Sequence, residues 1–202
     1  EVETGALRGN PFRYFFWLRT LGCVKGHQGG VYKVGWIERL AEAREAYNEA
    51  KGRVAVDVHT MPDPLSPSAE RWHEDIYRCQ ELQAEIEKDL ERLLPEVEEE
   101  YFASDAGRRA LNQVLLFWSA EHSCGYRQGM HEILAAVVLV VRAAAHAAAR
   151  LLRDGATTRH RELLAAVTEA TLEHDAYLLF GGIMRHLAAY YEVGRGEDAA
   201  VI

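Results

Sequence analysis

Hydrophobic positions recur along most of the chain with the spacing of an α-helix, and the strict alternation that is typical of strands is almost absent. Prolines and glycines divide the chain into blocks that share this helical pattern. The pattern predicts an all-α fold without internal repeats, whose helices pack by ridges into grooves. We expect helices over residues 11–21, 34–51, 69–94, 105–122, 128–153, 158–170 and 172–191.

The third of these blocks has the clearest apolar face. At about 100° per residue, four side chains fall on the same narrow face as Ile86 if the helix phase continues past Pro95: Leu82, Leu90, Leu93 and Val97. We therefore expect Ile86 to face the core.

Composition and charge exclude several classes of protein. The 202 residues are 49% hydrophobic and 27% charged, which is ordinary for a globular chain with a substantial core. The net charge of −8 argues against nucleic acid or an anionic membrane surface as the main partner, because both attract basic patches. Cys23, Cys79 and Cys124 are odd in number and lack C-x-x-C spacing, which indicates a reducing compartment rather than a disulfide framework.

The longest apolar run, residues 133–141, is followed by Arg142. A membrane-spanning helix needs about 20 apolar residues, so this run predicts a buried helix and no transmembrane segment. The beginning of the chain does not have the pattern of a secretory signal. We therefore expect a cytoplasmic protein.

The segment "IEKDLER", Ile86 to Arg92, is the first candidate for chemistry. Asp89 and Arg92 are three positions apart, a spacing that lets a carboxylate touch a guanidinium on a helix. The ordinary interpretation is a surface ion pair worth about 0–1 kcal/mol. The alternative is that Asp89 orients an arginine held at the protein edge for use on a partner.

The segment "GYRQGM", Gly125 to Met130, is the second candidate. Gln128 lies where a loop meets a predicted helix, with Tyr126 packed beneath it, and Gly129 would allow another backbone to approach closely. Alone, such an amide is ordinarily a helix cap or a loop residue. The combination with an arginine at the edge favours a glutamine that handles a water molecule.

These two segments resemble the motifs I-x-x-D-x-x-R and Y-x-Q-G-M of the TBC domain family, which activates the GTPase of Rab proteins. Further similarity is found in "ALRGNPF", where Phe12 replaces a family tryptophan, in "DPLS" at residues 63–66, in Trp72 and Pro95, and in "LEHDAYLLF" at residues 172–180. The order and separation of the motifs also match, so the resemblance spans about residues 7–190.

The resemblance implies that Arg92 acts as an arginine finger and Gln128 as a glutamine finger on GTP bound to a Rab protein. Ile86, Asp89, Tyr126 and Gly129 would support these two catalytic side chains, with Asp89 holding the guanidinium. GTP and Mg²⁺ would be carried by the Rab partner, so the chain would have no cofactor and no substrate turnover of its own. It would take part in vesicle trafficking and reach endomembranes peripherally, through that partner.

The sequence departs from the family pattern after the arginine, where Arg92-Leu93-Leu94-Pro95 replaces R-T-F-P. The change preserves apolar packing, and we expect it to be harmless. The family domain usually continues with further helices, so we expect residues 1–202 to be the N-terminal part of a TBC domain.

Three other interpretations remain. Cys124 and His122 could form a thiol hydrolase, and His122, Cys124 and His131 could bind a metal. The run "MHEILA" lacks the second histidine of H-E-x-x-H, because Ala135 occupies that position. The third interpretation is a catalytically silent TBC-like module that binds a small GTPase or a scaffold.

Overall fold

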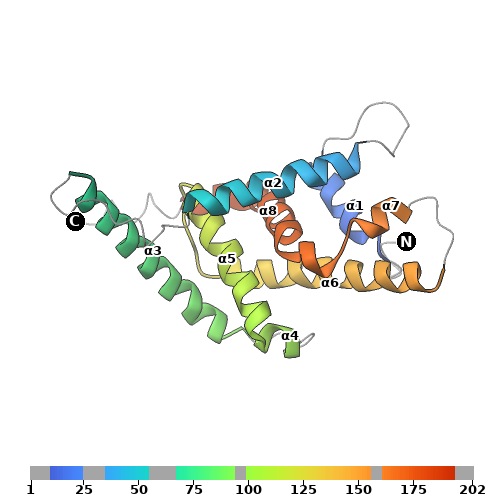
Figure 1. The fold of residues 1–202 in the computed structure, drawn as a ribbon. Helices are drawn as coiled ribbons and strands as arrows, with labels where there is room; N and C mark the ends of the chain where they lie inside the picture. Colours follow the sequence, from blue (N-terminus) through green and yellow to red (C-terminus); the bar gives the residue numbers. More distant parts are fainter. Residues whose placement is uncertain (1–9, 25–34, 55–66, 94–98, 156–160, 194–202) are drawn as a thin grey trace. The chain divides into compact units, whose positions relative to one another are not determined.

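The computed structural model describes residues 10–24, 35–54, 67–93, 99–155 and 161–193. Within these ranges all regular structure is helical and no strand occurs, which confirms the all-α prediction (Figure 1). The elements are α1 (Arg13–Thr20), α2 (Trp36–Val54), α3 (Pro67–Glu91), α4 (Glu99–Ala103), α5 (Asp105–Glu121), α6 (Met130–Arg153), α7 (Arg161–Ala165), the 3₁₀ turn η1 (Glu169–Thr171) and α8 (Leu172–Val193).

The predicted helix boundaries differ from the structure at the positions that matter most for the site. Helix α3 begins at Pro67, whose missing N–H is tolerated in a first turn, and ends at Glu91 rather than Leu94. Helix α6 begins at Met130 rather than Gln128. Both candidate catalytic residues, Arg92 and Gln128, therefore lie in turns just outside helices.

The prediction of one continuous helix over residues 158–170 is wrong. Residues 161–165 form α7, and η1 follows after a break. Thr168 has an extended backbone at φ −135° and ψ 162°, and its N–H donates to the hydroxyl of Thr171 at 3.4 Å. This local cap offers the backbone an alternative to helix continuation.

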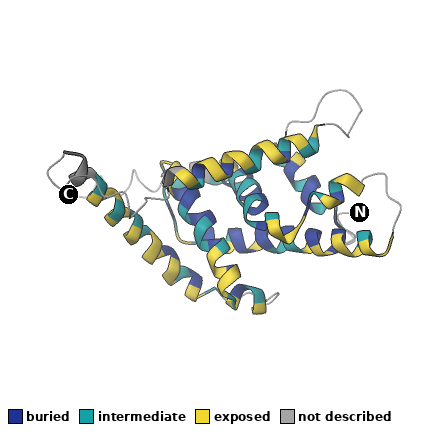
Figure 2. Ribbon diagram, in the orientation of Figure 1, coloured by how far each residue is buried: buried dark blue, intermediate teal, exposed yellow. Residues whose placement is uncertain are grey.

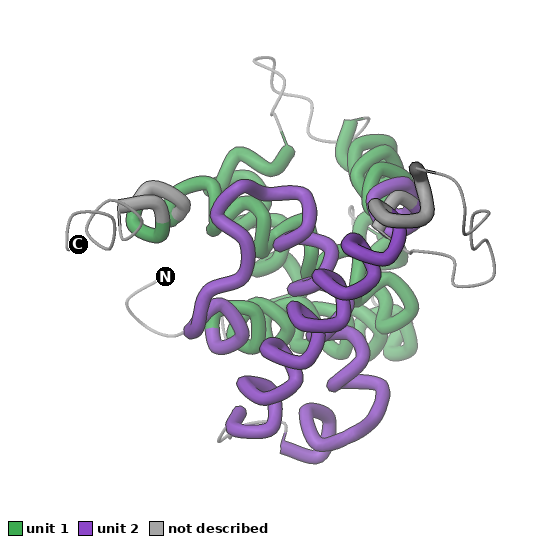
Figure 3. Tube along the Cα trace, turned by 90° about the vertical axis from the view of Figure 1, so that its left-hand side faces the viewer, with its two compact units in different colours: residues 1–47, 133–202 green, residues 48–132 purple. Residues whose placement is uncertain are grey.

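The chain divides into two compact units (Figure 3). Unit 1 contains Glu1–Tyr47 and Ile133–Ile202, and unit 2 contains Asn48–Glu132. The divisions fall within α2 and α6, so each of these helices contributes residues to both units.

Unit 1 buries the aromatic and aliphatic side chains of its helices. The largest fully buried side chains include Tyr14, Leu18, Leu40, Tyr47 and Phe180. Helix α1 contacts α8, and a Cβ atom at Gly182 would overlap Cys23 Sγ just after α1. The glycine is therefore required for the close approach of this segment to α8.

Unit 2 is organised around α5, against which both α3 and α4 pack. Ser104 caps α5 by accepting a hydrogen bond from the N–H of Gly107 at 3.1 Å. Helix α5 has a buried face along much of its length, whereas in α3 the buried side chains are those of Ile86 and Leu90 and the other described side chains are intermediate or exposed (Figure 2).

The predicted apolar face of α3 is confirmed at its centre. Ile86 is 0% and Leu90 is 7% exposed. Leu82 has intermediate exposure, as has Leu93, which lies beyond the end of the helix, whereas Val97 falls outside the described residues.

Helix α6 is long and apolar enough to cross a membrane by length and composition, with a mean hydropathy of 1.8. Half of its most apolar window is buried inside the structure, and the core helix of a soluble protein can pass the same test of length and composition. The apolar run 133–141 is part of this longer helix. The length of the run, which predicted a buried helix from the sequence, therefore does not distinguish a membrane-spanning helix from a core helix.

Candidate functional site

Arg92 lies in the turn that ends α3. Its backbone N–H donates to the carbonyl of Asp89 at 3.1 Å, and its side chain is exposed. The preceding turns of α3 are anchored by the buried side chains of Ile86 and Leu90. A buried helix face therefore holds the backbone of an arginine whose guanidinium reaches solvent.

Gln128 lies in the turn that leads into α6, and its side chain is also exposed. Met130, the first residue of α6, is 0% exposed. The N–H of Arg127 donates to Met130 Sδ at 3.3 Å, and the N–H of Met130 donates to the carbonyl of Arg127 at 3.1 Å. A buried methionine thus anchors the short loop that presents the glutamine.

Gly129 shapes this loop through its backbone angle. Its φ is +95°, a value that residues with a side chain rarely adopt. Within the described part of the chain, no heavy atom lies within 4 Å of a Cβ atom built at Gly129, so no close backbone approach inside the chain accounts for this glycine. Its positive φ does.

A hydrogen-bonded group of three side chains joins the two motif segments; we call Asp89, Tyr126 and His131 the Asp89 cluster. The hydroxyl of Tyr126 donates to Asp89 Oδ2 at 2.7 Å and lies 3.1 Å from His131 Nδ1. His131 Nδ1 is 3.7 Å from Asp89 Oδ2. Arg92 follows Asp89 by three positions, and Gln128 follows Tyr126 by two. The cluster therefore brings together, within unit 2, the segment that contains Arg92 and the segment that contains Gln128.

The Asp89 cluster is largely removed from solvent. Tyr126 is 5% exposed, and the side chains of His131 and Asp89 are 8% and 13% exposed. Burial, together with the hydrogen bond to the Asp89 carboxylate and its negative charge, raises the pKa of Tyr126 well above its usual value. Tyr126 is therefore a neutral donor.

The contact of Asp89 with Tyr126 was not foreseen. The sequence placed Tyr126 beneath the glutamine loop and Asp89 against Arg92. Among the described residues, the Asp89 carboxylate contacts Tyr126 and His131 and makes no ion pair with the Arg92 guanidinium. The guanidinium is thus exposed and unpaired within the described part of the chain.

His131 was considered from the sequence only as a metal ligand. Its place in the Asp89 cluster could have been suspected from one signal, the polar pair His131 and Glu132 between the buried Met130 and the apolar continuation of α6. Nothing in the spacing identifies Tyr126 as its partner, since the intervening loop conformation decides that contact.

The residues of the hydrolase and metal interpretations occupy separate environments. Cys124 is buried, and the ring of His122 stacks on Trp118 at 4.2 Å while its Nδ1 lies 2.7 Å from the Trp118 carbonyl. In the described ranges, no group of three or more His, Cys, Asp or Glu side chains is arranged to hold a metal ion.

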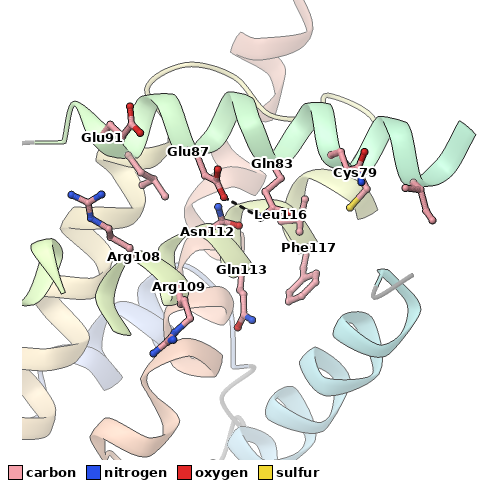
Figure 4. Close-up of a pocket in the computed structure, with 13 residues that line it drawn as sticks. Cys79, Gln83, Glu87, Glu91, Arg108, Arg109, Asn112, Gln113, Leu116 and Phe117 are labelled. Atoms are coloured by element: carbon pink, nitrogen blue, oxygen red, sulfur yellow. Dashed lines mark hydrogen bonds between the residues drawn. The ribbon is translucent and has the colours of Figure 1, made fainter. Parts of the chain in front are cut away.

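Unit 2 also has a groove of about 640 Å³ between α3 and α5 (Figure 4). Glu87 and Glu91 line it from α3, and Arg108 and Arg109 line it from α5. Leu90, Leu116 and Phe117 supply apolar lining. Its mixture of carboxylates and guanidinium groups is not that of a pocket for a triphosphate, since the carboxylates would repel the phosphate oxygens.

Comparisons with known proteins agree with the motifs. TBC1 domain family member 5 of Homo sapiens is 30% identical over 194 residues, which cover 89% of this chain and 23% of that protein. The Mus musculus protein of the same name is 28% identical over 194 residues (89% and 22%), and TBC1 domain family member 5 homolog B of Dictyostelium discoideum is 26% identical over 192 residues (93% and 18%).

The chain spans about a quarter or less of the length of these relatives. No solved structure gives a significant match to it. The family model described as Rab-GTPase-TBC domain matches residues 67–194, which include Arg92, Gln128 and the whole Asp89 cluster. By this match over well over half of its length, the chain belongs to the Rab-GTPase-TBC domain family.

Proposed function

We propose that this chain accelerates GTP hydrolysis by a Rab-family small GTPase, with Arg92 and Gln128 supplied in trans. Membership of the Rab-GTPase-TBC family supports Rab GTPase activation in general. The observation that carries the two-residue mechanism is the 2.7 Å hydrogen bond between Tyr126 and Asp89. It joins the segment of an exposed arginine to the segment of an exposed glutamine, and neither side chain is buried in the core.

Arg92 stabilises the charge that spreads over the phosphoryl oxygens during hydrolysis. A planar guanidinium donates two parallel hydrogen bonds to phosphate oxygens, which an ammonium group does not. Arginine fingers of GTPase activators are worth about 10³- to 10⁵-fold in rate, or roughly 4–7 kcal/mol. A surface ion pair, at about 0–1 kcal/mol, would be a much weaker use of the same side chain.

Gln128 orients the attacking water through its side-chain carbonyl and takes the place of the GTPase's own glutamine. An amide suits this role because it both donates and accepts hydrogen bonds without adding charge near the phosphates. Holding the nucleophile and the charge-stabilising group on one rigid support lowers the entropy cost of reaching the transition state.

The nucleotide and Mg²⁺ belong to the Rab partner in this proposal, and the chain contributes side chains only. The protein would act in the cytoplasm and reach endomembranes through the Rab protein to which it binds.

The test is single-turnover GTP hydrolysis by a panel of Rab proteins with the wild-type chain and its variants. We expect Arg92→Ala and Arg92→Lys to lose at least about 10³-fold of the acceleration, because lysine lacks the planar fork. Gln128→Ala should also lose most of it. Arg78→Ala is the matched control, since Arg78 is another exposed arginine on α3.

Normal acceleration by Arg92→Ala would remove Arg92 from the mechanism. If the wild-type chain binds a GTP-loaded Rab without accelerating hydrolysis, the chain is a binding module and the catalytic proposal fails. Far-UV circular dichroism of each variant checks that the helices are retained.

A further inference from the structure

We infer that His131 is a positioning residue that fixes the segment of Gln128 relative to the segment of Arg92. The inference rests on the proposed function for its catalytic consequence, but the positioning itself is a property of this chain alone. His131 lies in the first turn of α6, three residues after Gln128, and its ring is buried beside Tyr126.

The protons of the Asp89 cluster determine the direction of each hydrogen bond. The Tyr126 hydroxyl has a single hydrogen, which it donates to the Asp89 carboxylate at 2.7 Å. The contact of 3.1 Å with His131 therefore requires the histidine to donate from Nδ1 to the phenolic oxygen. His131 thus carries its proton on Nδ1, and Tyr126 both donates and accepts.

In this arrangement the Tyr126 hydroxyl makes two hydrogen bonds, and the second of them comes from the His131 imidazole. One bond joins Tyr126 to the end of α3, and the other joins it to the start of α6. The loop from Tyr126 to Gly129 is short and contains a glycine at positive φ, Gly129. With the His131 bond removed, the phenol remains bonded to Asp89 while the start of α6 loses its polar link to it.

A purely structural role for His131 makes a different prediction. If the ring only filled space, a leucine of similar bulk would serve as well, and asparagine would be a poor replacement because it is smaller. If its donor matters, leucine should fail and asparagine should succeed, since the asparagine amide nitrogen can donate from nearly the position of Nδ1.

The experiment compares His131→Leu, His131→Asn and Tyr126→Phe with wild type, and uses His186→Leu as the control because His186 is exposed on α8. Hydrogen–deuterium exchange measures the two segments directly, independently of any GTPase. His131→Leu and Tyr126→Phe should raise exchange in peptides that cover residues 89–93 and 125–131. His131→Asn and His186→Leu should leave both segments at the wild-type rate.

The catalytic readout is kcat and KM with a GTP-loaded Rab as substrate. We expect His131→Leu to lower kcat by about 10- to 100-fold with little change in KM, because misplacing a catalytic group by about 1 Å can cost about 100-fold in rate. His131→Asn should restore kcat to near the wild-type value. In wild type, nitrogen-15 NMR of the His131 ring should show the proton on Nδ1.

The outcomes separate this inference from the proposed function. If wild type accelerates no Rab, the proposed function fails, and the exchange and NMR measurements still decide the positioning role. Unchanged exchange in both segments of the Leu and Phe variants would overturn the inference, as would a His131 ring without a proton on Nδ1. A loss of kcat in His131→Leu that asparagine does not restore would assign His131 a packing role instead.

Discussion

Each unit of the molecule contains a buried polar cluster that joins helices, and the two clusters are built differently. In unit 1, Arg44 of α2 pairs with Asp175 of α8. In unit 2, the Asp89 cluster joins α3 to the start of α6. In both units a tyrosine also donates to a carboxylate, Tyr47 to Glu173 at 2.6 Å and Tyr126 to Asp89 at 2.7 Å.

The unit 1 cluster is closed upon itself. Asp175 is 0% exposed and accepts from Arg44 Nε at 2.9 Å, from Arg44 Nη2 at 2.8 Å and from the Thr171 hydroxyl at 3.0 Å. Arg44 Nη2 also donates to the carbonyl of Ala166 at 2.7 Å. The Asp175 carboxylate thus accepts three hydrogen bonds in a fully buried position, so this bidentate pair has a structural role.

The Asp89 cluster is instead a support for groups that point outward. Its hydrogen bonds hold two backbone segments, while the arginine and the glutamine on those segments remain exposed. The comparison shows that an arginine three residues from a carboxylate on a helix does not necessarily form an ion pair with it. Burial decides whether a guanidinium serves the fold, as Arg44 does, or is available to a partner, as Arg92 is.

The largest expected effect on stability comes from breaking the unit 1 cluster. Arg44→Met removes the partner of a carboxylate that is completely buried, and we expect a loss of about 3–5 kcal/mol in the free energy of unfolding. Urea denaturation measures it. Arg150→Met, at an exposed position on α6, should change stability by less than about 0.5 kcal/mol.

The double variant Arg44→Met/Asp175→Leu sharpens this result. Most of the loss in Arg44→Met is the cost of an unpaired buried charge, so removing that charge should recover a large part of the stability. A double variant less stable than Arg44→Met would show that specific hydrogen bonds, rather than charge burial, hold α2 and α8.

The sequence could predict the helices, the inward face at Ile86 and the exposure of the two motif side chains, because these follow from helical period and polarity. It could not predict the Asp89–Tyr126 bond, since 37 positions separate the two residues and only tertiary packing brings them together. The helical pattern also predicted a helix that continues through Thr168, where a side-chain cap competes with the helix. The motif resemblance, rather than periodicity, was needed to choose Arg92 and Gln128 among many exposed polar residues.

The next effect concerns the loop of unit 2. Gly129→Ala places a Cβ atom on a backbone at φ +95°, and we expect a loss of about 1–2 kcal/mol in stability together with slower GTPase activation. Gly52→Ala is a matched control in the same unit, because Gly52 is helical and a Cβ there meets nothing within 4 Å. That control should be neutral or stabilising by up to about 1 kcal/mol.

If Gly129→Ala lowers stability without lowering activation, the angle at this glycine serves folding only. If neither changes, the loop adopts another conformation in solution and the support for Gln128 differs from the one described.

The smallest expected effect tests the two tyrosines against each other at alkaline pH. Burial first, and then the hydrogen bond to a carboxylate and its charge, raises the pKa of Tyr47 and of Tyr126 above the usual value near 10. In the unfolded chain each phenol loses its proton near pH 10, whereas in the folded chain it keeps it. Each tyrosine therefore contributes stability that is complete below about pH 10 and is lost as pH rises above it.

Tyr47→Phe and Tyr126→Phe should each lower stability by about 1 kcal/mol at neutral pH, because a partly buried carboxylate loses its donor. Each should also remove up to about 1.4 kcal/mol per pH unit from the decline of wild type above about pH 10, so that the wild-type and variant curves converge. Urea titrations between about pH 8 and pH 11 measure this slope, to which Tyr14, also raised in pKa by burial, contributes equally in all three proteins. Of the two variants, only Tyr126→Phe should slow GTPase activation. An equal slowing by Tyr47→Phe would show that activation depends on the stability of both units rather than on the Asp89 cluster that supports the segments of Arg92 and Gln128.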